Sequence, residues 1–277
     1  MKRNKTFNGQ KPILYLIATP IGNLKEMSPR ALEVISEMDI IAAEDTRNAF
    51  SLLANFGIKK DLFSLREHNE VEASKHLLSK ILEGKKVAYM SDAGYPGISD
   101  PGYLLVQEMI KNDISVSTIS GSSAFINALV ASGLDTKHFY FYGFLPAKEN
   151  EAKEEILSLR NKKETLIFYE APHRINKTLN LLREGLGNRY ACLARELTKI
   201  NEEFIRGNLE ELETLNDIKG EMVLIVEGNK EEVNVDDDKI TARVAYFIKL
   251  GLSQKDAINV VSEEFNVNKN YIKKLVF

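Results

Sequence analysis

The chain has 277 residues, of which 44% are hydrophobic and 28% are charged, which provides enough apolar side chains for about two domains. Its formal net charge of −3 argues against a protein that coats nucleic acid over its whole surface. The single cysteine, Cys192, excludes an intrachain disulfide, and no Cys-x-x-Cys motif or His/Cys cluster indicates a zinc site. No apolar run approaches the ~18 residues of a membrane span and no signal-peptide pattern is present, so we expect a cytoplasmic protein that needs no metal and no membrane.

Short apolar segments alternate with helical patterns in the first half of the chain. A strand is predicted over 13–18, and Ser28 and Pro29 then have the residue types of an N-cap and a first helical position. Further strands are predicted over 40–42, 87–90 and 114–119, with helices after them that include 104–110 and 124–130. Strands that alternate with helices pair in parallel, so we expect an α/β sheet between two layers of helices.

The second half predicts a further α/β region and then a change of character. Its predicted strands are 165–169, 191–194, 204–206 and 222–226, and its helices are 148–160 and 173–183. We expect an N-terminal α/β domain over 1–144, a second α/β domain of mixed strand order over 145–228, an acidic linker over 229–238, and a small helical, helix-turn-helix-like domain over 239–277. This last segment carries seven Lys/Arg and three acidic residues, a charge opposite in sign to that of the whole chain.

The densest turn signal is the segment 91–102, Ser-Asp-Ala-Gly-Tyr-Pro-Gly-Ile-Ser-Asp-Pro-Gly. It follows a predicted buried strand and therefore lies at the carboxyl edge of the sheet, where open α/β proteins bind ligands. Four more polar or turn-forming segments, 19–24, 44–47, 121–124 and 169–174, follow other predicted strands. We interpret them together as an active-site cleft between the two halves. No P-loop, Rossmann fingerprint or nucleophile elbow is present, which argues against phosphoryl, hydride and acyl transfer.

Several motifs occur in one unbroken order: TPIGNL, EDTR, SDAGYPGISDPG, GFLP, FYEAPHR, LARELTK and GEMVLIV. In this order the chain resembles the ribosomal RNA small subunit methyltransferase I family of the tetrapyrrole-methylase superfamily. The resemblance implies S-adenosylmethionine-dependent methylation of the ribose 2′-hydroxyl of a cytidine in the decoding region of 16S rRNA, within the 30S subunit, by a homodimer. Two positions depart from the family pattern: Tyr95 stands where threonine is usual, and Ser120-Gly121-Ser122 replaces Pro-Gly-Pro.

The resemblance also assigns candidate site residues, position by position. The cofactor-binding candidates are Pro20, Ile21, Asp92, Tyr95, Pro96, Ile98, Ser123, Ala124, Tyr169, Ala194 and Met222. A ribose hydroxyl is a weak nucleophile, so a nearby base would help, and Glu170, Glu196, Asp45 and His173 remain open as candidates. The candidates for holding RNA phosphates are Arg47, His68, Asn69, Arg174, Arg195 and Lys199, together with the basic segment 239–277.

Two other functions remain compatible with the sequence. A methyltransferase of corrin or sirohaem intermediates shares the expected fold, but it predicts a Gly-x-Gly-Pro-Gly-Asp loop where this chain has Ala-Thr-Pro-Ile-Gly-Asn at 18–23. A catalytically inactive RNA- or ribosome-binding protein is the second alternative. The charged site residues also have structural alternatives, such as an ion pair of Arg47 with Asp45.

Overall fold

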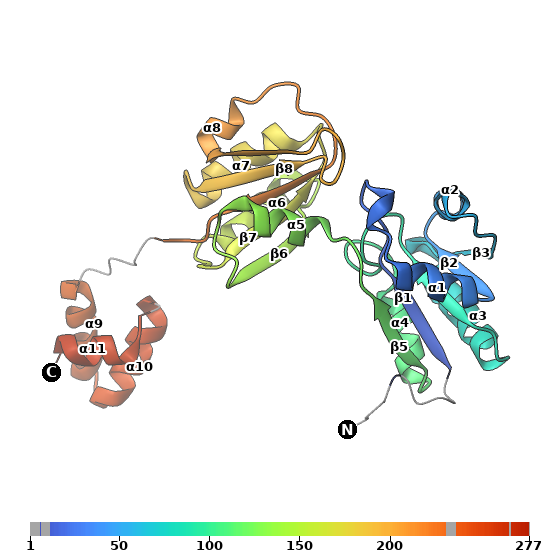
Figure 1. Cartoon of the computed structure of the whole chain (residues 1–277). Coiled ribbons are helices and arrows are strands. Elements are labelled where there is room, and N and C mark those ends of the chain that lie inside the picture. The colour runs from blue at the N-terminus through green and yellow to red at the C-terminus, as the bar shows by residue number, and fades with distance from the viewer. Residues whose placement is uncertain (1–5, 7–11, 231–236, 266, 277) are drawn as a thin grey trace. The chain divides into compact units, whose positions relative to one another are not determined.

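The computed structural model of the chain describes residue 6 and residues 12–230, 237–265 and 267–276. Two compact units, Met1–Gly228 and Asn229–Phe277, divide the chain. The first contains two α/β regions, each built on its own sheet (Figure 1). Most of the acidic linker predicted over 229–238 lies outside the described residues. Within the described ranges, no helix is long and apolar enough to cross a membrane.

The first sheet has five strands in the order β3-β2-β4-β1-β5, and every neighbouring pair is parallel. Its strands are β1 (Ile13–Ile17), β2 (Ile40–Ala43), β3 (Asp61–Ser64), β4 (Val87–Met90) and β5 (Ser115–Ile119). Helices of this half are α1 (Pro29–Glu37), α2 (Thr46–Asn55), α3 (Glu70–Leu82), α4 (Tyr103–Lys111) and α5 (Ala124–Ser132). Because the strands are parallel, their carboxyl ends share one edge.

Alternating side chains of β1 divide the core of this half into two layers. Leu14 and Leu16 join the cluster that contains Leu77 of α3 and Leu105 of α4. Ile17 joins the opposite cluster, with residues of α1 and α2. The predicted parallel sheet between two helical layers is therefore confirmed. Ser28 also begins α1 as predicted, because its hydroxyl accepts a hydrogen bond from the amide of Ala31 at 3.1 Å.

The second sheet is mixed, as predicted, with the order β6-β7-β10-β8-β9. Only β6 and β7 are parallel, and the other neighbouring pairs are antiparallel. The strands are β6 (Phe139–Phe144), β7 (Thr165–Glu170), β8 (Tyr190–Arg195), β9 (Glu203–Asn208) and β10 (Met222–Val226). The helices that follow within it are α6 (Glu149–Leu159), α7 (Ile175–Leu186) and α8 (Leu209–Glu213), which cover one face. Cys192 is fully buried in this sheet.

The other face of the second sheet is covered by α5. Ala128 and Leu129 of this helix pack against Ile167 of β7 and Val223 of β10. The last helix of the first half thus packs on the second sheet, and the boundary expected after residue 144 stays a prediction. The strand β6, which precedes that boundary, pairs with β7 and not with a strand of the first half.

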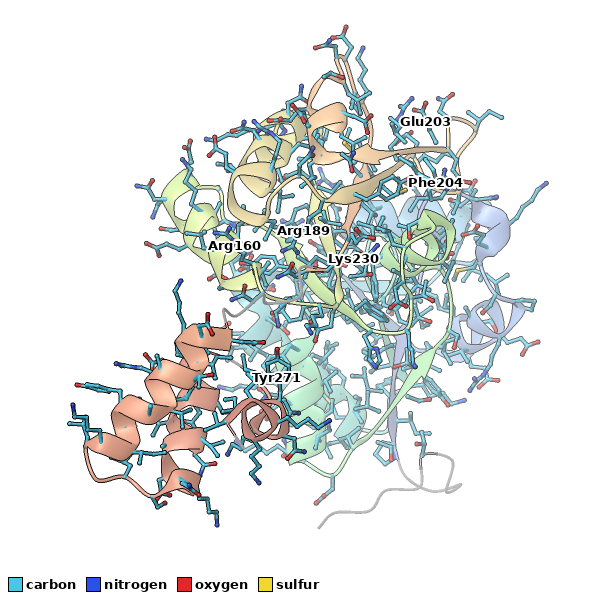
Figure 2. All side chains as sticks on the ribbon, turned by 90° about the vertical axis from the view of Figure 1, so that its left-hand side faces the viewer. Arg160, Arg189, Glu203, Phe204, Lys230 and Tyr271 are labelled. Atoms are coloured by element: carbon cyan, nitrogen blue, oxygen red, sulfur yellow. The ribbon has the colours of Figure 1, made fainter. Side chains whose placement is uncertain are left out.

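Arg189 ties together the ends of several elements in the second half (Figure 2). Its guanidinium donates hydrogen bonds to the carbonyl oxygens of Leu186 at 3.1 Å, of Glu227 at 3.3 Å, and of Arg160. These carbonyls lie at the end of α7, just after β10 and just after α6. One guanidinium that donates to carbonyl oxygens at the ends of three elements stabilises this edge of the second half.

The C-terminal unit contains α9 (Asp237–Lys249), α10 (Gln254–Phe265) and α11 (Lys269–Val276). Their shared core includes Ile240, Val244 and Ile272. The Tyr271 hydroxyl, labelled in Figure 2, donates a hydrogen bond to an Asp237 carboxylate oxygen at 2.8 Å, which joins α11 to the start of α9. The apolar side chains of the three short helices share one core, so their charged side chains lie at the surface of the unit.

A buried carboxylate, that of Glu70 on α3, fixes the start of α4. Its Oε1 atom accepts hydrogen bonds from the amides of Gly102 and Leu104, both at 2.8 Å, and of Leu105 at 3.3 Å. The first amides of a helix have no partner within the helix, and a negative charge there also meets the positive end of the helix dipole. Glu70 therefore holds the turn that ends the segment 91–102.

We expect Glu70→Ala to lower the free energy of unfolding by about 2–3 kcal/mol, because buried amides would lose a charged acceptor. Urea unfolding followed by circular dichroism measures this change. Glu72→Ala, on the exposed side of α3, is the matched control and should cost less than about 1 kcal/mol. Equal losses in the two variants would contradict the capping role.

Candidate functional site

A cavity of about 380 Å³ lies at the carboxyl edge of the first sheet. It receives residues from the loops after β1, β4 and β5 and from the ends of β6, β7, β8 and β10. Its lining consists of Ile21, Ala93, Gly94, Tyr95, Ile98, Ser99, Asp100, Ser123, Ala124, Phe144, Tyr169, Glu170, Ala171, Pro172, Leu197, Glu221, Met222 and Val223. The volume and the mostly apolar lining are typical of a small-molecule site, and both halves contribute, as the sequence predicted.

Backbone hydrogen bonds join the loops after β1 and β4. Thr19 and Gly94 exchange two of them, at 2.9 and 3.1 Å. The buried Thr19 hydroxyl also donates to the carbonyl of Ser91 at 3.2 Å. Gly121, after β5, lies so close to Ala18 that an added Cβ would be 2.9 Å from the Ala18 carbonyl oxygen. Main chain therefore forms this wall of the cavity, and glycine is required at 121.

The two departures from the family pattern lie in direct contact. The Tyr95 hydroxyl accepts a hydrogen bond from the Gly121 amide at 3.3 Å. The neighbouring Ser122 hydroxyl donates to a carboxylate oxygen of Glu26 at 2.5 Å. Proline fixes a loop through its ring, whereas here two side-chain hydrogen bonds hold the 120–122 segment. Tyr95 thus combines a cavity wall with support for the adjacent loop.

Seven of the predicted cofactor-binding residues line the cavity and four do not. Those that line it are Ile21, Tyr95, Ile98, Ser123, Ala124, Tyr169 and Met222. Pro20, Asp92, Pro96 and Ala194 lie outside the lining. Ala194 is fully buried in the cluster between the second sheet and α5, because alternate residues of β8 point to opposite faces.

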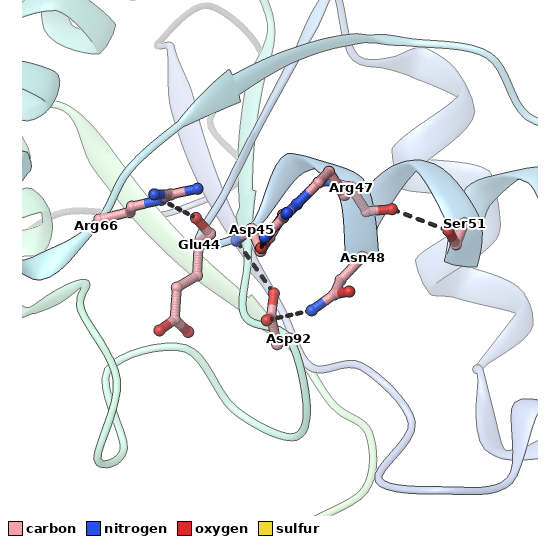
Figure 3. A network of polar contacts seen from close by, with 7 residues as sticks. All are labelled: Glu44, Asp45, Arg47, Asn48, Ser51, Arg66 and Asp92. Atoms are coloured by element: carbon pink, nitrogen blue, oxygen red, sulfur yellow. Dashed lines mark hydrogen bonds and ion pairs between the residues drawn. The ribbon is translucent and has the colours of Figure 1, made fainter.

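Asp45 begins α2 and is paired with Arg47 (Figure 3). Its Oδ1 accepts from the Arg47 amide at 2.9 Å and from Nε of the same residue at 3.0 Å, while Oδ2 meets Nη2 at 2.5 Å. Hydrogen bonds from Arg47 hold the pKa of the Asp45 carboxyl well below its usual range. A carboxylate so engaged is a poor proton acceptor, and the ion pair considered as an alternative is present.

Asp92 supports the same helix start from the neighbouring loop. One of its carboxylate oxygens accepts from the Asp45 amide at 3.2 Å and the other from the Asn48 side-chain amide at 2.6 Å (Figure 3). On the other side, Arg66 Nε donates to the carbonyl of Glu44 at 3.2 Å. These hydrogen bonds of Asp92 join the loops after β2 and β4, and its role at the cofactor stays a prediction.

The other candidate bases are either engaged or exposed. Glu170 lines the cavity, but Oε2 accepts from the Thr178 hydroxyl at 2.5 Å and Oε1 from the Ala171 amide at 2.8 Å. Glu196 Oε1 accepts from Lys199 Nζ at 3.0 Å and lies outside the lining, and this hydrogen bond lowers the pKa of the Glu196 carboxyl. His173 is exposed and also lies outside the lining.

Most of the predicted phosphate-binding residues have partners within the protein. Arg174 donates to the carbonyls of Leu145 and Pro146, Arg195 pairs with Glu203, and Lys199 pairs with Glu196 and Glu221. The Asn69 side chain holds a turn, accepting from the Arg66 amide at 2.7 Å. His68 is exposed, and Arg47 leaves 84% of its side chain exposed while Asp45 fixes its direction.

Asp100 is the residue that the sequence interpretation overlooked. It lies in the predicted loop and was read only as a helix start, yet its side chain lines the cavity. Burial, followed by the negative charges of Glu44 and Asp92, raises the pKa of the Asp100 carboxyl to about 7. A carboxylic acid with a pKa displaced upward in a cleft marks a functional-site candidate. The available sequence signal was an ionisable residue inside the Gly- and Pro-rich loop, and the structure adds that its neighbour Ser99 has φ 63°.

Comparison with known proteins agrees with this geometry. Residues 13–213 match the family model for tetrapyrrole (corrin/porphyrin) methylases. Relatives named ribosomal RNA small subunit methyltransferase I are 45% identical in Halalkalibacterium halodurans, 40% in Bacillus subtilis and 42% in Vibrio cholerae. These alignments cover 95–99% of this chain and 93–97% of each relative. The chain belongs to the ribosomal RNA small subunit methyltransferase I branch of the tetrapyrrole methylase family.

Solved structures show the same fold at much lower identity. The methyltransferase CobJ superposes with a TM-score of 0.60 at 16% identity, over 79% of this chain and 95% of that one. Diphthine synthase gives 0.62 at 16% identity, over 79% and 91%. Identities this low support the architecture only. Across the described part of the chain, no cluster of His, Cys, Asp or Glu side chains could hold a metal ion.

We expect Tyr95→Phe to raise the hydrogen-exchange rate of the Gly121 amide by about tenfold, because that amide would lose its acceptor. Mass spectrometry of deuterated peptides spanning 115–125 measures the change. Tyr103→Phe, which removes an exposed hydroxyl bonded to Gln107, is the control and should leave those peptides unchanged. Unaltered exchange in Tyr95→Phe would show that the loop is held by other contacts.

Proposed function

We propose that the protein uses S-adenosylmethionine to methylate the ribose 2′-hydroxyl of a cytidine in the decoding region of 16S rRNA. The observation that carries this proposal is the near-full-length identity of 40–45% to relatives named ribosomal RNA small subunit methyltransferase I. The cavity at the junction of the two halves supports it, because a methyl donor and an acceptor must be aligned at one place.

The cavity suits the donor in shape and charge. Ile21, Ile98 and Met222 offer apolar surface, and Gly94 lets main chain approach closely. Three carboxylic side chains also line it, those of Asp100, Glu170 and Glu221. Negative groups around an apolar cavity favour a sulfonium cation. S-Adenosylmethionine supplies an activated methyl group, and the protein's task is to hold it in line with the acceptor.

Cationic groups outside the cavity support an RNA substrate. Arg47 stands exposed at the start of α2, and Asp45 keeps its guanidinium in one direction. An oriented guanidinium is suited to a phosphate oxygen. The positive charge of the C-terminal segment is concentrated in α11, which carries Lys269, Lys273 and Lys274 and no acidic residue. We propose that this unit contacts rRNA of the 30S subunit.

A homodimer and a cytoplasmic location complete the proposal. Exposed apolar side chains on α5 and β6, those of Ile126, Val130, Phe139 and Tyr140, support a surface that a second copy covers. Phe125 and Phe139, whose ring centres are 6.4 Å apart, place the two elements side by side. A substrate within the ribosome supports location in the cytoplasm. Sedimentation equilibrium of the full chain measures the assembly.

The alternative functions are less well supported. A tetrapyrrole substrate rests on fold likeness alone, because CobJ shares only 16% identity with this chain. An inactive binding protein is disfavoured by a cavity that retains an uncommitted carboxyl group, Asp100, beside apolar donor-sized space.

Transfer of a radiolabelled methyl group to purified 30S subunits tests the proposal directly. We expect one 2′-O-methylated cytidine in 16S rRNA, located by mass spectrometry of nuclease fragments. A chain that ends at residue 238 should bind the donor normally and lose most of this activity. Absence of labelling by the full chain, combined with donor binding in calorimetry, would favour the inactive or tetrapyrrole alternatives.

We expect Arg47→Ala to lower kcat/KM for the RNA about tenfold, because one phosphate contact is removed. Donor affinity, measured by calorimetry, should stay unchanged. Lys59→Ala, which removes an exposed cation beyond the other end of α2, is the control. Equal losses of donor affinity and RNA turnover would indicate that Arg47 acts through the fold and not through RNA.

A further inference from the structure

The three acidic side chains that line the cavity differ in their partners. Glu170 accepts from Thr178 and Ala171, and Glu221 pairs with Lys199 Nζ at 2.9 Å. Among the described residues, nothing forms a hydrogen bond or ion pair with the Asp100 carboxyl group. Both lone-pair regions of this group are therefore free to accept a proton from a molecule in the cavity.

We propose that Asp100 is the general base that receives the proton of the acceptor hydroxyl during methyl transfer. The assignment rests on the proposed function for the reaction, but its evidence is the geometry of this cavity. It is preferred to the four bases predicted from sequence: Asp45 and Glu196 are ion-paired away from the lining, both oxygens of Glu170 already accept hydrogen bonds, and His173 lies outside the lining.

Hydrogen bonds hold the backbone immediately after Asp100. The carbonyl of Pro101 accepts from the Tyr89 hydroxyl at 2.9 Å and from the Gly97 amide at 3.1 Å. The next residue, Gly102, is bound by the buried Glu70 carboxylate. A base contributes most when it is fixed before the substrate arrives, because no reorganisation is then needed at the moment of reaction.

The charges around Asp100 suit a base that works near neutral pH. Glu44 and Asp92 face it from the loops after β2 and β4, and no cation is among the groups that perturb it. Burial, together with the charge of Asp100, also raises the pKa of the Tyr89 and Tyr169 phenols. Burial and this repulsion raise the pKa of the carboxyl to about 7, which gives a stronger proton acceptor than an ordinary aspartate.

The step balances in atoms and electrons. The ribose 2′-oxygen forms a bond to the methyl carbon while the carbon–sulfur bond breaks and its electron pair stays on sulfur, leaving S-adenosylhomocysteine as the thioether product. The hydroxyl proton passes to the Asp100 carboxylate, which becomes a carboxylic acid and later returns the proton to solvent. One positive charge is thus lost from sulfur and one negative charge from the carboxylate.

Asp100→Asn keeps the shape of the side chain and removes the proton acceptor. We expect kcat on 30S subunits to fall by about 10²–10³, with donor affinity changed less than about threefold. In the wild type, kcat should rise with pH through a midpoint of about 7, and this limb should be absent from the variant. Asp61→Asn, at the amino end of β3 and on the opposite edge of the sheet, is the matched control.

A measurement without turnover separates this role from a folding defect. Infrared difference spectra of the unliganded protein, recorded between about pH 5 and about pH 8, should show a carboxylic-acid band that disappears as pH rises and is missing in Asp100→Asn. Because folding raises the pKa of Asp100, protonation of this group stabilises the native state at low pH, and that stabilisation is lost as pH rises through the folded pKa of about 7. The wild type should therefore lose stability relative to the variant as pH rises from about 4 to about 7.

Three outcomes would overturn the assignment. Undiminished kcat in Asp100→Asn would exclude the residue as a base, and so would a pH limb shared by both proteins. A large loss of donor affinity in Asp100→Asn, with turnover restored at high donor concentration, would make Asp100 a binding residue. In each case the wild type still methylates 30S subunits, whereas failure of the wild type itself would refute the proposed function instead.

Discussion

The cavity depends on the contact between Glu70 and the amino end of α4. A charged carboxylate buried beside three backbone amides converts a glycine- and proline-rich loop into a fixed wall, although the loop contains little regular structure. Tyr89 reinforces this wall by binding the Pro101 carbonyl from the middle of the sheet. Because the 91–102 loop is fixed where it ends, its earlier residues can line the cavity without filling it.

A second constraint is that α5 serves both halves of the first unit. It leaves the first sheet through the close contact of Gly121 with Ala18, yet it packs on the second sheet through Ala128 and Leu129. The cavity residues Ser123 and Ala124 begin this helix, so their placement follows from packing on both sides. Backbone contacts at Gly94 and Gly121 thus fix the loops around the site, and Tyr95 lines the cavity while it is bonded to one of them.

Local patterns predicted the parallel sheet, the mixed sheet and the strand-end loops, because each leaves a periodic or turn signal. β3 was missed because four residues, Asp61–Ser64, are too few to show alternation, and only pairing with β2 makes them a strand. The partners of the carboxylates were equally hidden. Glu196 accepts from the amide of Glu221 because β8 pairs with β10, a long-range contact. Without knowledge of those partners, the four candidate bases could not be ranked from the sequence, and Asp100 had only the pattern of a turn residue.

The charges of the site separate its two substrates. Inside, the carboxyl groups of Asp100, Glu170 and Glu221 line the cavity, so negative charge there favours a cation. Outside, Arg47 presents a fixed positive charge to solvent. A polyanion is attracted to the rim and repelled from the interior, whereas a sulfonium is attracted inward. Only a short, uncharged part of an RNA chain, such as one sugar hydroxyl, can enter without meeting that repulsion, which is the part that methyl transfer requires.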